Sequence, residues 1–277
     1  MDGVLKPGRY INGEWNAARK EWDYALLKVA LCFPDIYEIG MSHLGMKIIY
    51  GILNNEKDVL CERVFTPWND MEQKLRAMGE PLVSLENRKP LREFDIIGFS
   101  LQYEMGYVDV LNMLDLGNVP LRSEDRGDSD PIVIAGGPCA FNPEPMVDFI
   151  DAFVIGEAEE AILEMANVVK GLGCRVKNSR QNILQELSKI EGIYVPAFTL
   201  SAYGETSPAT SGGHPSPFTL HPKPFTINKR IIKDLNNAYF PTSPVVPYIQ
   251  IVHDRITIEI MRGCPHQCRF CQACRIF

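Results

Sequence analysis

The sequence has no long hydrophobic run, no excess of positive charge and no signal-like start. No apolar stretch approaches the roughly 18 residues of a membrane-spanning helix, so no segment predicts a membrane span. Acidic residues outnumber basic ones by 35 to 28, and this balance excludes a general attraction to nucleic acid or to an anionic membrane surface. The first residues, MDGVLKPGRYINGEWN, lack the charged and apolar regions of a signal peptide, so we expect a cytoplasmic protein.

Cysteine is scarce until the last part of the chain. Of the 8 cysteines, half are scattered and the other half fall close together near the end. A secreted disulfide scaffold is short and rich in cysteine throughout, whereas this chain has 277 residues. We therefore expect the scattered cysteines to be small buried residues and the clustered ones to bind a metal. The scattered ones are Cys32, Cys61, Cys139 and Cys174, and the clustered ones are Cys264, Cys268, Cys271 and Cys274.

Apolar runs alternate with amphipathic stretches over residues 28–173. Several runs are apolar on both faces, which is typical of parallel strands covered by helices on both sides. The sequence therefore predicts an α/β fold with a doubly wound, Rossmann-like parallel sheet. Strands are expected at 28–34, 59–65, 94–102 and 130–138 and at the start of 151–173, each followed by a helix. Pro67 suits the first turn of the second helix, and Gly79 suits its C-terminal cap.

Ligands of such a sheet bind beyond the carboxyl ends of its strands, so the turns there carry the candidate site. These turns are residues 35–45, 100–106, 136–144 and 156–159. Gly136 and Gly137 would let the backbone approach a ligand closely. Gly156 ends a strand, and we expect Glu157, Glu159 and Glu160 in the first helical turn, where acidic residues also stabilise a helix without any ligand.

Four segments are expected along the chain. They are an N-terminal extension (1–27), the sheet domain (28–173), a hairpin with a proline-rich linker (174–247) and the start of a further unit (248–277). The hairpin would pair residues 192–204 with 223–235 around a loop rich in Pro, Ser and Gly. The last unit opens with IQIVHDRITIEIMRGC, which predicts a strand that leads into the clustered cysteines.

The clustered cysteines lie on one short loop, RGCPHQCRFCQAC. A structural zinc site usually clamps two separated pairs of ligands, so zinc would need His266 or Cys274 as a fourth ligand in a cramped loop. A [4Fe–4S] cluster can be held by closely spaced thiolates, and three of them would leave one iron open. The spacing alone leaves the zinc site and the iron–sulfur cluster both open, and it gives Cys274 no settled role.

The segment CPHQCRFC matches the CxxxCxΦC signature, where Φ is an aromatic residue, and so resembles the radical S-adenosylmethionine (SAM) superfamily. The resemblance implies that Cys264, Cys268 and Cys271 each bind one iron of a [4Fe–4S] cluster. It implies that SAM binds the fourth iron and yields a 5′-deoxyadenosyl radical, that Phe270 helps to hold the adenine, and that a flavodoxin or ferredoxin supplies the electron. The substrate is unknown.

The preceding domain resembles the cobalamin-binding class of that superfamily, in one uncharacterised subgroup. Segments that carry the likeness include FPDIYEIGMSHLGMKIIY, IAGGPCAFNPEPMVDFIDAFVIGEAEEAI and HDRITIEI. The resemblance implies a cobalamin pocket that would include Ser42, His43, Gly136, Gly137, Gly156 and Glu157. In the DxHxxG motif of many cobalamin proteins the histidine binds cobalt, but here Met41 replaces the aspartate and Gly45 comes one residue early. The broken motif favours His43 as a helix-start residue over a cobalt ligand.

Two other functions stay open at this point. One is a methylthiotransferase-like protein, in which Cys32, Cys61 and Cys139 would hold a second cluster. The other is a binding module that holds a corrinoid or a nucleotide and carries zinc on its tail. Since a β/α barrel needs on the order of 200 further residues, we expect the 277-residue chain to be the front part of a radical enzyme and inactive alone.

Overall fold

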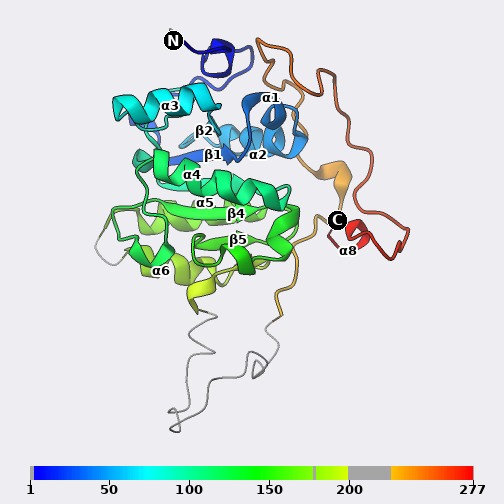
Figure 1. The fold of residues 1–277 in the computed structure, drawn as a ribbon. Helices are drawn as coiled ribbons and strands as arrows, with labels where there is room; N and C mark the ends of the chain where they lie inside the picture. Colours follow the sequence, from blue (N-terminus) through cyan, green and yellow to red (C-terminus); the bar gives the residue numbers. More distant parts are fainter. Residues whose placement is uncertain (1–2, 177–178, 199–225, 277) are drawn as a thin grey trace, which may run out of the picture.

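A computed structural model describes residues 3–176, 179–198 and 226–276. Its centre is a six-stranded sheet in the order β2-β1-β3-β4-β5-β6, in which only β6 runs antiparallel. The predicted α/β fold with a doubly wound parallel sheet is confirmed (Figure 1). The strands are β1 (Leu27–Phe33), β2 (Val59–Phe65), β3 (Ile96–Ser100), β4 (Ile132–Gly136), β5 (Ala152–Val154) and β6 (Ile193–Tyr194).

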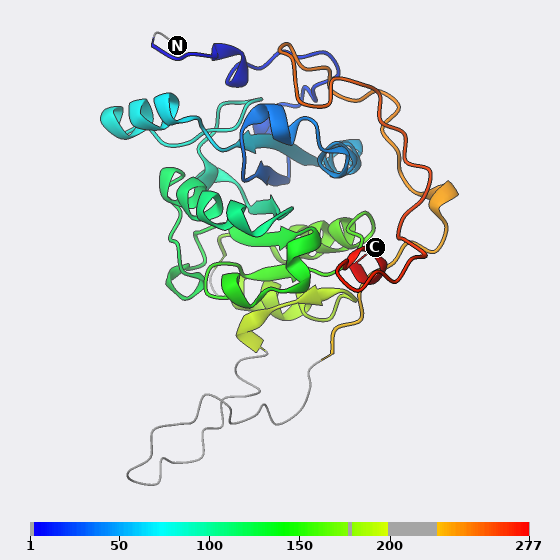
Figure 2. The ribbon, with the colours of Figure 1, turned by 45° about the vertical axis from the view of Figure 1, so that its right-hand side comes forward.

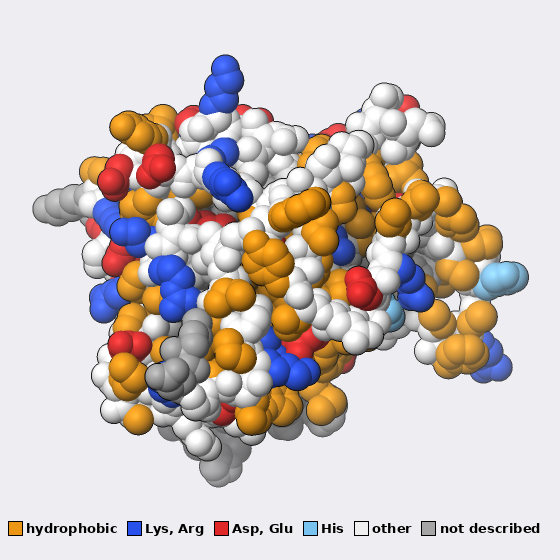
Figure 3. Space-filling model, turned by 90° about the horizontal axis from the view of Figure 1, so that it is seen from above, with side chains coloured by type: hydrophobic (Ala, Val, Ile, Leu, Met, Phe, Trp, Pro, Cys, Tyr) orange, Lys and Arg blue, Asp and Glu red, His pale blue; other side chains and the backbone are white. Residues whose placement is uncertain are grey.

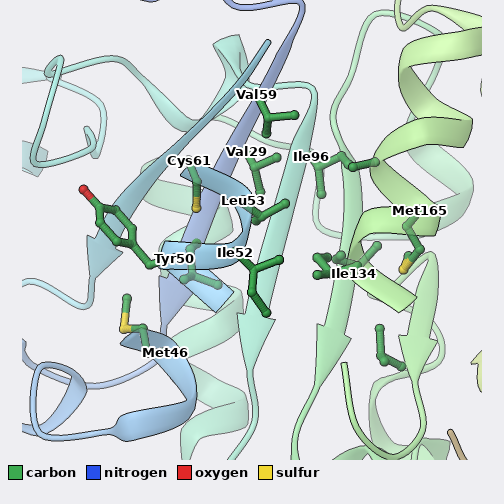
Figure 4. Packing of buried hydrophobic residues seen from close by; sticks show 14 of the residues in the cluster. Val29, Met46, Tyr50, Ile52, Leu53, Val59, Cys61, Ile96, Ile134 and Met165 are labelled. Carbon is green, nitrogen blue, oxygen red and sulfur yellow. The ribbon is translucent and has the colours of Figure 1, made fainter. Parts of the chain in front are cut away.

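The central strands are buried on both faces because helices cover both sides of the sheet. One core cluster lies between the sheet and α2 (Leu44–Asn55), α5 (Ala161–Leu172) and α6 (Ser179–Leu187). The other lies under α4 (Tyr107–Leu116) and the turns that follow β4. Figure 4 shows the first cluster, with Ile52 and Leu53 of α2 directed toward Val29 and Ile96 of the sheet.

Most helix ends follow the local signals in the sequence. In α3 (Asn69–Met78), Gly79 ends the helix with a φ of 65°, as its predicted capping role requires. The N-cap of α3 is Trp68, so Pro67 lies two residues before the first helical residue, Asn69, and the prediction that it occupies the first turn is wrong. A four-residue helix, α1 (Tyr37–Gly40), also follows β1, and α6 was not predicted.

The N-terminal segment is fixed to the edge of the sheet by a buried charge network. Arg63, inside the edge strand β2, donates from Nε to Glu86 over 2.7 Å and pairs through Nη2 with Glu14. Tyr37 and Tyr50 donate their hydroxyl hydrogens to the same two carboxylates. The network joins Glu14, Arg63 of β2 and Glu86, which are far apart in the sequence, and so holds the chain before β1 against the sheet.

The predicted hairpin falls partly outside the described residues, which also exclude its loop at 205–222. The described parts of both arms bond to β5 or to the residues that follow it. Ile193 and Tyr194 form β6 against β5, and Arg230 makes an isolated parallel bridge to Gly156.

The segment from 249 to 263 does not form the predicted strand. It runs as irregular chain, with Ile256, Ile258 and Ile260 exposed, and it pairs with no strand of the described residues. A strand needs a neighbour for its backbone hydrogen bonds, and the alternating pattern alone does not supply one. Figure 3 shows exposed hydrophobic side chains among charged ones, many on the side where this segment runs in Figure 1. The cysteine loop follows this segment and leads into the short helix α8 (Ala273–Ile276).

Candidate functional site

A cavity of about 330 Å³ lies at the carboxyl ends of β1, β3, β4 and β5. In the order β2-β1-β3-β4-β5, the connection after β1 leads to β2 on one side and the connection after β3 leads to β4 on the other. Ligands of open α/β sheets bind at such a switch point, which here lies between β1 and β3. Leu31, Phe99 and Ile134 of the strands contribute apolar walls, and Ile48 and Ile162 do so from α2 and α5. The cavity has the position and the mainly apolar lining of a small-molecule site.

The cavity brings together most of the predicted site residues of the sheet domain. His43, Gly136, Gly137, Gly156 and Glu157 all line it. Ser42 stands apart from this lining: its Oγ donates to the Glu38 carbonyl over 2.7 Å and accepts from the His253 backbone N–H over 3.0 Å. Ser42 thereby ties the C-terminal segment to the loop after β1.

His43 is the N-cap of α2. Its Nδ1 accepts a hydrogen bond from the Met46 backbone N–H over 3.2 Å, which leaves the proton of the neutral ring on Nε2. Burial lowers the pKa of His43, and a hydrogen bond with the Gln102 side chain opposes that shift. The ring also packs against Phe33, with the ring centroids 5.5 Å apart. These contacts support the helix-start role that the broken motif favours.

The three glycines at the cavity differ in why they must be glycine. Gly137 has a φ of 101°, and a Cβ there would lie 2.6 Å from the Leu101 carbonyl oxygen. Gly156 has a φ of 104°, and its Cβ would collide with the backbone of Arg230. A Cβ on Gly136 would meet Val154 only at an ordinary 3.6 Å. The chain itself therefore requires Gly137 and Gly156, whereas Gly136 leaves room at the cavity wall.

The acidic residues of GEAEE do not lie in the first helical turn, so that prediction is wrong. Helix α5 begins at Ala161 with Glu160 as N-cap, because the positive φ of Gly156 and a following turn delay it. The carboxylates form ion pairs with two arginines. Arg262 pairs with Glu157 and Glu159, and Arg230 pairs with Glu160 and with Glu164 of α5.

The loop with the clustered cysteines runs past the cavity, and α8 lies near the carboxyl ends of β4 and β5 (Figure 2). Cys264 and Cys274 are half-buried, whereas Cys268 and Cys271 are exposed. Phe270 is 92% exposed and contributes to no core cluster. Across residues 3–176, 179–198 and 226–276, no three metal-binding side chains are gathered into a ligand group. All four thiols of the loop are free of disulfides.

Three residues that were not predicted from the sequence also line the cavity: Gln102, Glu259 and Arg262. Gln102 lies in a turn that was singled out, and its Nε2 donates to Ser100 Oγ over 2.8 Å. Arg262 directly precedes Gly263 and Cys264, where the cysteine loop begins. Its position beside the motif could therefore have marked it as a site residue. Its partners Glu157 and Glu159 could not be identified because they lie far away in the sequence, after β5.

Residues 45–196 match the family described as radical SAM proteins, N-terminal. An uncharacterised protein of Methanocaldococcus jannaschii, MJ0966, is 25% identical over 250 residues, which cover 90% of this chain and 41% of that protein. The chain thus spans less than half the length of this curated relative. In the part of the chain that the structure describes, no helix is long and apolar enough to span a membrane.

A solved structure also matches, though distantly. It is the radical S-adenosylmethionine methyltransferase TsrM of Kitasatospora setae, with tryptophan substrate and a SAM analogue bound. The match covers 52% of this chain and 26% of that one at 14% identity, with a TM-score of 0.35. Such a score carries no inference about the site.

Proposed function

The chain belongs to the family of radical SAM proteins, N-terminal, and from this premise we propose that it carries the cofactor-binding front portion of a radical SAM enzyme. Cys264, Cys268 and Cys271 would hold a [4Fe–4S] cluster, and Phe270 would contact the adenine of SAM. The strand-end cavity would take part of a corrinoid. The reaction of the whole protein and its reductant, a flavodoxin or ferredoxin, are part of the same proposal.

One observation carries the proposal: the cysteine loop is bracketed by two residues that line the cavity. Arg262 precedes Cys264, and Ile276 follows Cys274, and both contribute to the wall of the strand-end cavity. A metal group on this loop and a ligand in the cavity would therefore be neighbours. Enzymes that combine two cofactors need such proximity, whereas a structural zinc tail does not.

The donor chemistry of the loop fits an iron–sulfur cluster. It offers closely spaced, accessible thiols, and such sulfur ligands are typical of iron–sulfur sites. The Cys271 N–H donates to the Cys268 carbonyl over 3.1 Å, a turn that keeps these two cysteines on one bend. Because the thiols are not gathered, the loop must close when it binds a cluster. When bound, the cluster would supply the electron that cleaves SAM.

The size of the cavity limits what it holds. At about 330 Å³ it is at the small end of ligand sites, large enough for a nucleotide-sized group and too small for a whole cobalamin. We therefore assign it to the nucleotide end of a corrinoid, with the rest of the corrinoid outside. The same observation favours a second candidate function, a module that binds a free nucleotide.

Anaerobic reconstitution of the purified chain with iron and sulfide tests the cluster. We expect about four irons per chain and absorbance near 400 nm that changes when SAM is added. The Cys271→Ser variant should lose most of the iron, whereas Cys274→Ser should keep it. Equal loss in both variants, or a wild-type chain that binds one zinc and no iron, would contradict the proposal. Clearly more than four irons would favour the methylthiotransferase alternative.

Equilibrium binding of hydroxocobalamin and of a free purine nucleotide, each measured by titration on the reconstituted chain, tests the cavity. Binding of the corrinoid but not the nucleotide supports the first assignment. Nucleotide binding alone supports the nucleotide module, and binding of neither contradicts both.

A further inference from the structure

Arg262 sits between three carboxylates at the rim of the cavity. Its Nη2 lies 2.5 Å from Glu159 Oε1, and its Nη1 lies 3.3 Å from Glu157 Oε1. Glu259, three residues before it, accepts from Nε and Nη2 over 2.9 Å each. All four side chains are at least three-quarters shielded from solvent, so these contacts are stronger than ordinary surface ion pairs.

The acidic loop after β5 is divided between two arginines. Arg230 pairs with Glu160 at 2.7 Å and with Glu164 at 2.6 Å, so these carboxylates need no partner from the C-terminal segment. Glu157 and Glu159 instead have Arg262 as their positively charged partner. Glu157 also accepts from the Ile232 backbone N–H, which holds its carboxylate in place. The contact thus joins Arg262 to a preformed part of the sheet domain.

The cysteine loop is held at its far end as well. Lys229 donates from Nζ to the Arg275 carbonyl over 3.1 Å, and Ile276 lines the cavity. Between Arg262 and Arg275 the loop makes few contacts, and Cys268 and Cys271 are exposed. The two anchors therefore fix where the loop starts and ends and leave its middle free to close around a metal group.

We propose that Arg262 is a positioning residue that fastens the cysteine loop to the cavity through Glu157 and Glu159. The ion pairs keep Cys264 at the rim, so that a cluster on the loop faces a ligand in the cavity. The part of this inference that concerns the cluster rests on the proposed function. The part that concerns the fastening of the loop does not.

Carboxyl footprinting of the metal-free chain tests the fastening. Carbodiimide coupling of glycine ethyl ester, read by peptide mass spectrometry, should label Glu157 and Glu159 about fivefold faster in Arg262→Gln than in the wild type. Arg262→Lys should restore much of the protection. Arg255→Gln is the matched control, because Arg255 lies exposed in the same segment and makes no ion pair among the described residues. Equal labelling in Arg262→Gln and wild type would overturn the proposal.

Two internal references show whether a variant is folded. Glu124 has a side chain 76% exposed and should label equally in every variant, whereas the fully buried Asp151 should stay unlabelled. Labelling of Asp151 in Arg262→Gln would show that this variant is unfolded. The reciprocal variant Glu157→Gln/Glu159→Gln then tests the fastening of the loop. Phenylglyoxal should then modify Arg262 about fivefold faster than in the wild type, and an unchanged rate would overturn the proposal.

Iron release tests the consequence for the cluster. After reconstitution, Arg262→Gln should hold as much iron as the wild type, because the cysteines are intact, but lose it to a chelator about fivefold faster. Arg262→Lys should be intermediate and Arg255→Gln unchanged. Equal release rates in Arg262→Gln and wild type would refute the positioning role. A wild-type chain without iron would refute the proposed function instead, while the footprint would still decide the fastening.

Discussion

Replacing Gly137 with alanine should destabilise the protein, whereas the same change at its neighbour Gly136 should not. Gly137 has a φ of 101° and a ψ of −178°, a region that side chains rarely adopt at a cost of about 1–3 kcal/mol. The new Cβ would also lie 2.6 Å from the Leu101 carbonyl oxygen, and such overpacking costs about 1–3 kcal/mol. The stiffer unfolded chain offsets only about 0.4–1 kcal/mol. The expected net loss is about 3 kcal/mol.

Gly136 is the matched control for this change. It ends β4 with an ordinary backbone, and a Cβ there would meet Val154 at 3.6 Å. We therefore expect Gly136→Ala to change the free energy of unfolding by less than about 1 kcal/mol. The two positions are adjacent and both line the cavity, so either alanine would fill part of it. A difference in stability between the two variants therefore reports the backbone strain and the close contact at Gly137.

Urea unfolding followed by tryptophan fluorescence measures the difference. Trp22 packs edge-to-face on the buried Phe94, with ring centroids 4.9 Å apart, and so reports on the core. With a urea dependence of about 3 kcal/mol per molar, the Gly137→Ala midpoint should fall by roughly 1 M. A midpoint within about 0.2 M of the wild type would refute the account of Gly137. A comparable fall for Gly136→Ala would show that any side chain at this wall is harmful.

His43→Ala should cost about 1 kcal/mol of stability through loss of the α2 cap, and His43→Asn, which keeps an acceptor, should cost much less; thermal unfolding of both variants checks this. Burial lowers the pKa of His43, so the folded chain binds this proton more weakly than the unfolded chain and stability should fall as pH drops below about 6.5. His43→Asn should lack that component, and identical pH dependence in both proteins would contradict it. Arg63→Met leaves Glu14 and Glu86 buried without their cation and should cost at least about 3 kcal/mol in urea unfolding, whereas Arg255→Met on the surface should cost less than about 0.5 kcal/mol.

The sheet domain could be predicted from the sequence because its signals are local and repeated. β2 begins and ends at the predicted residues, and α2 follows the first strand as expected, because its N-cap and its apolar pattern both favour a helix there. The strand-end turns were also identified, because parallel strands place their carboxyl ends on one edge. What the pattern could not decide was why each glycine is there, since that depends on Leu101 and Arg230, which approach from elsewhere in the chain.

The buried charges could not be predicted from the sequence for a related reason. VLCERVF was recognised as a strand, yet periodicity gives no reason to bury Glu62 and Arg63 completely. Their burial is possible only because Glu14 and Glu86 surround Arg63, and Ser84 and Asn87 donate hydrogen bonds to Glu62. A buried charge needs such partners, and they come from segments that no local pattern connects.

The position of the cysteine segment depends on interactions that its local motif does not contain. The alternation of Ile256, Ile258 and Ile260 predicted that a strand would carry Cys264 to the site, but without a neighbouring strand that pattern has no hydrogen-bond partner. In the structure, Arg262, two residues before Cys264, pairs with the loop after β5 at the rim of the cavity. Ion pairs tolerate a change of backbone conformation better than a hydrogen-bonded ladder does. We therefore expect Arg262 to keep these carboxylates as partners if the segment pairs with a strand.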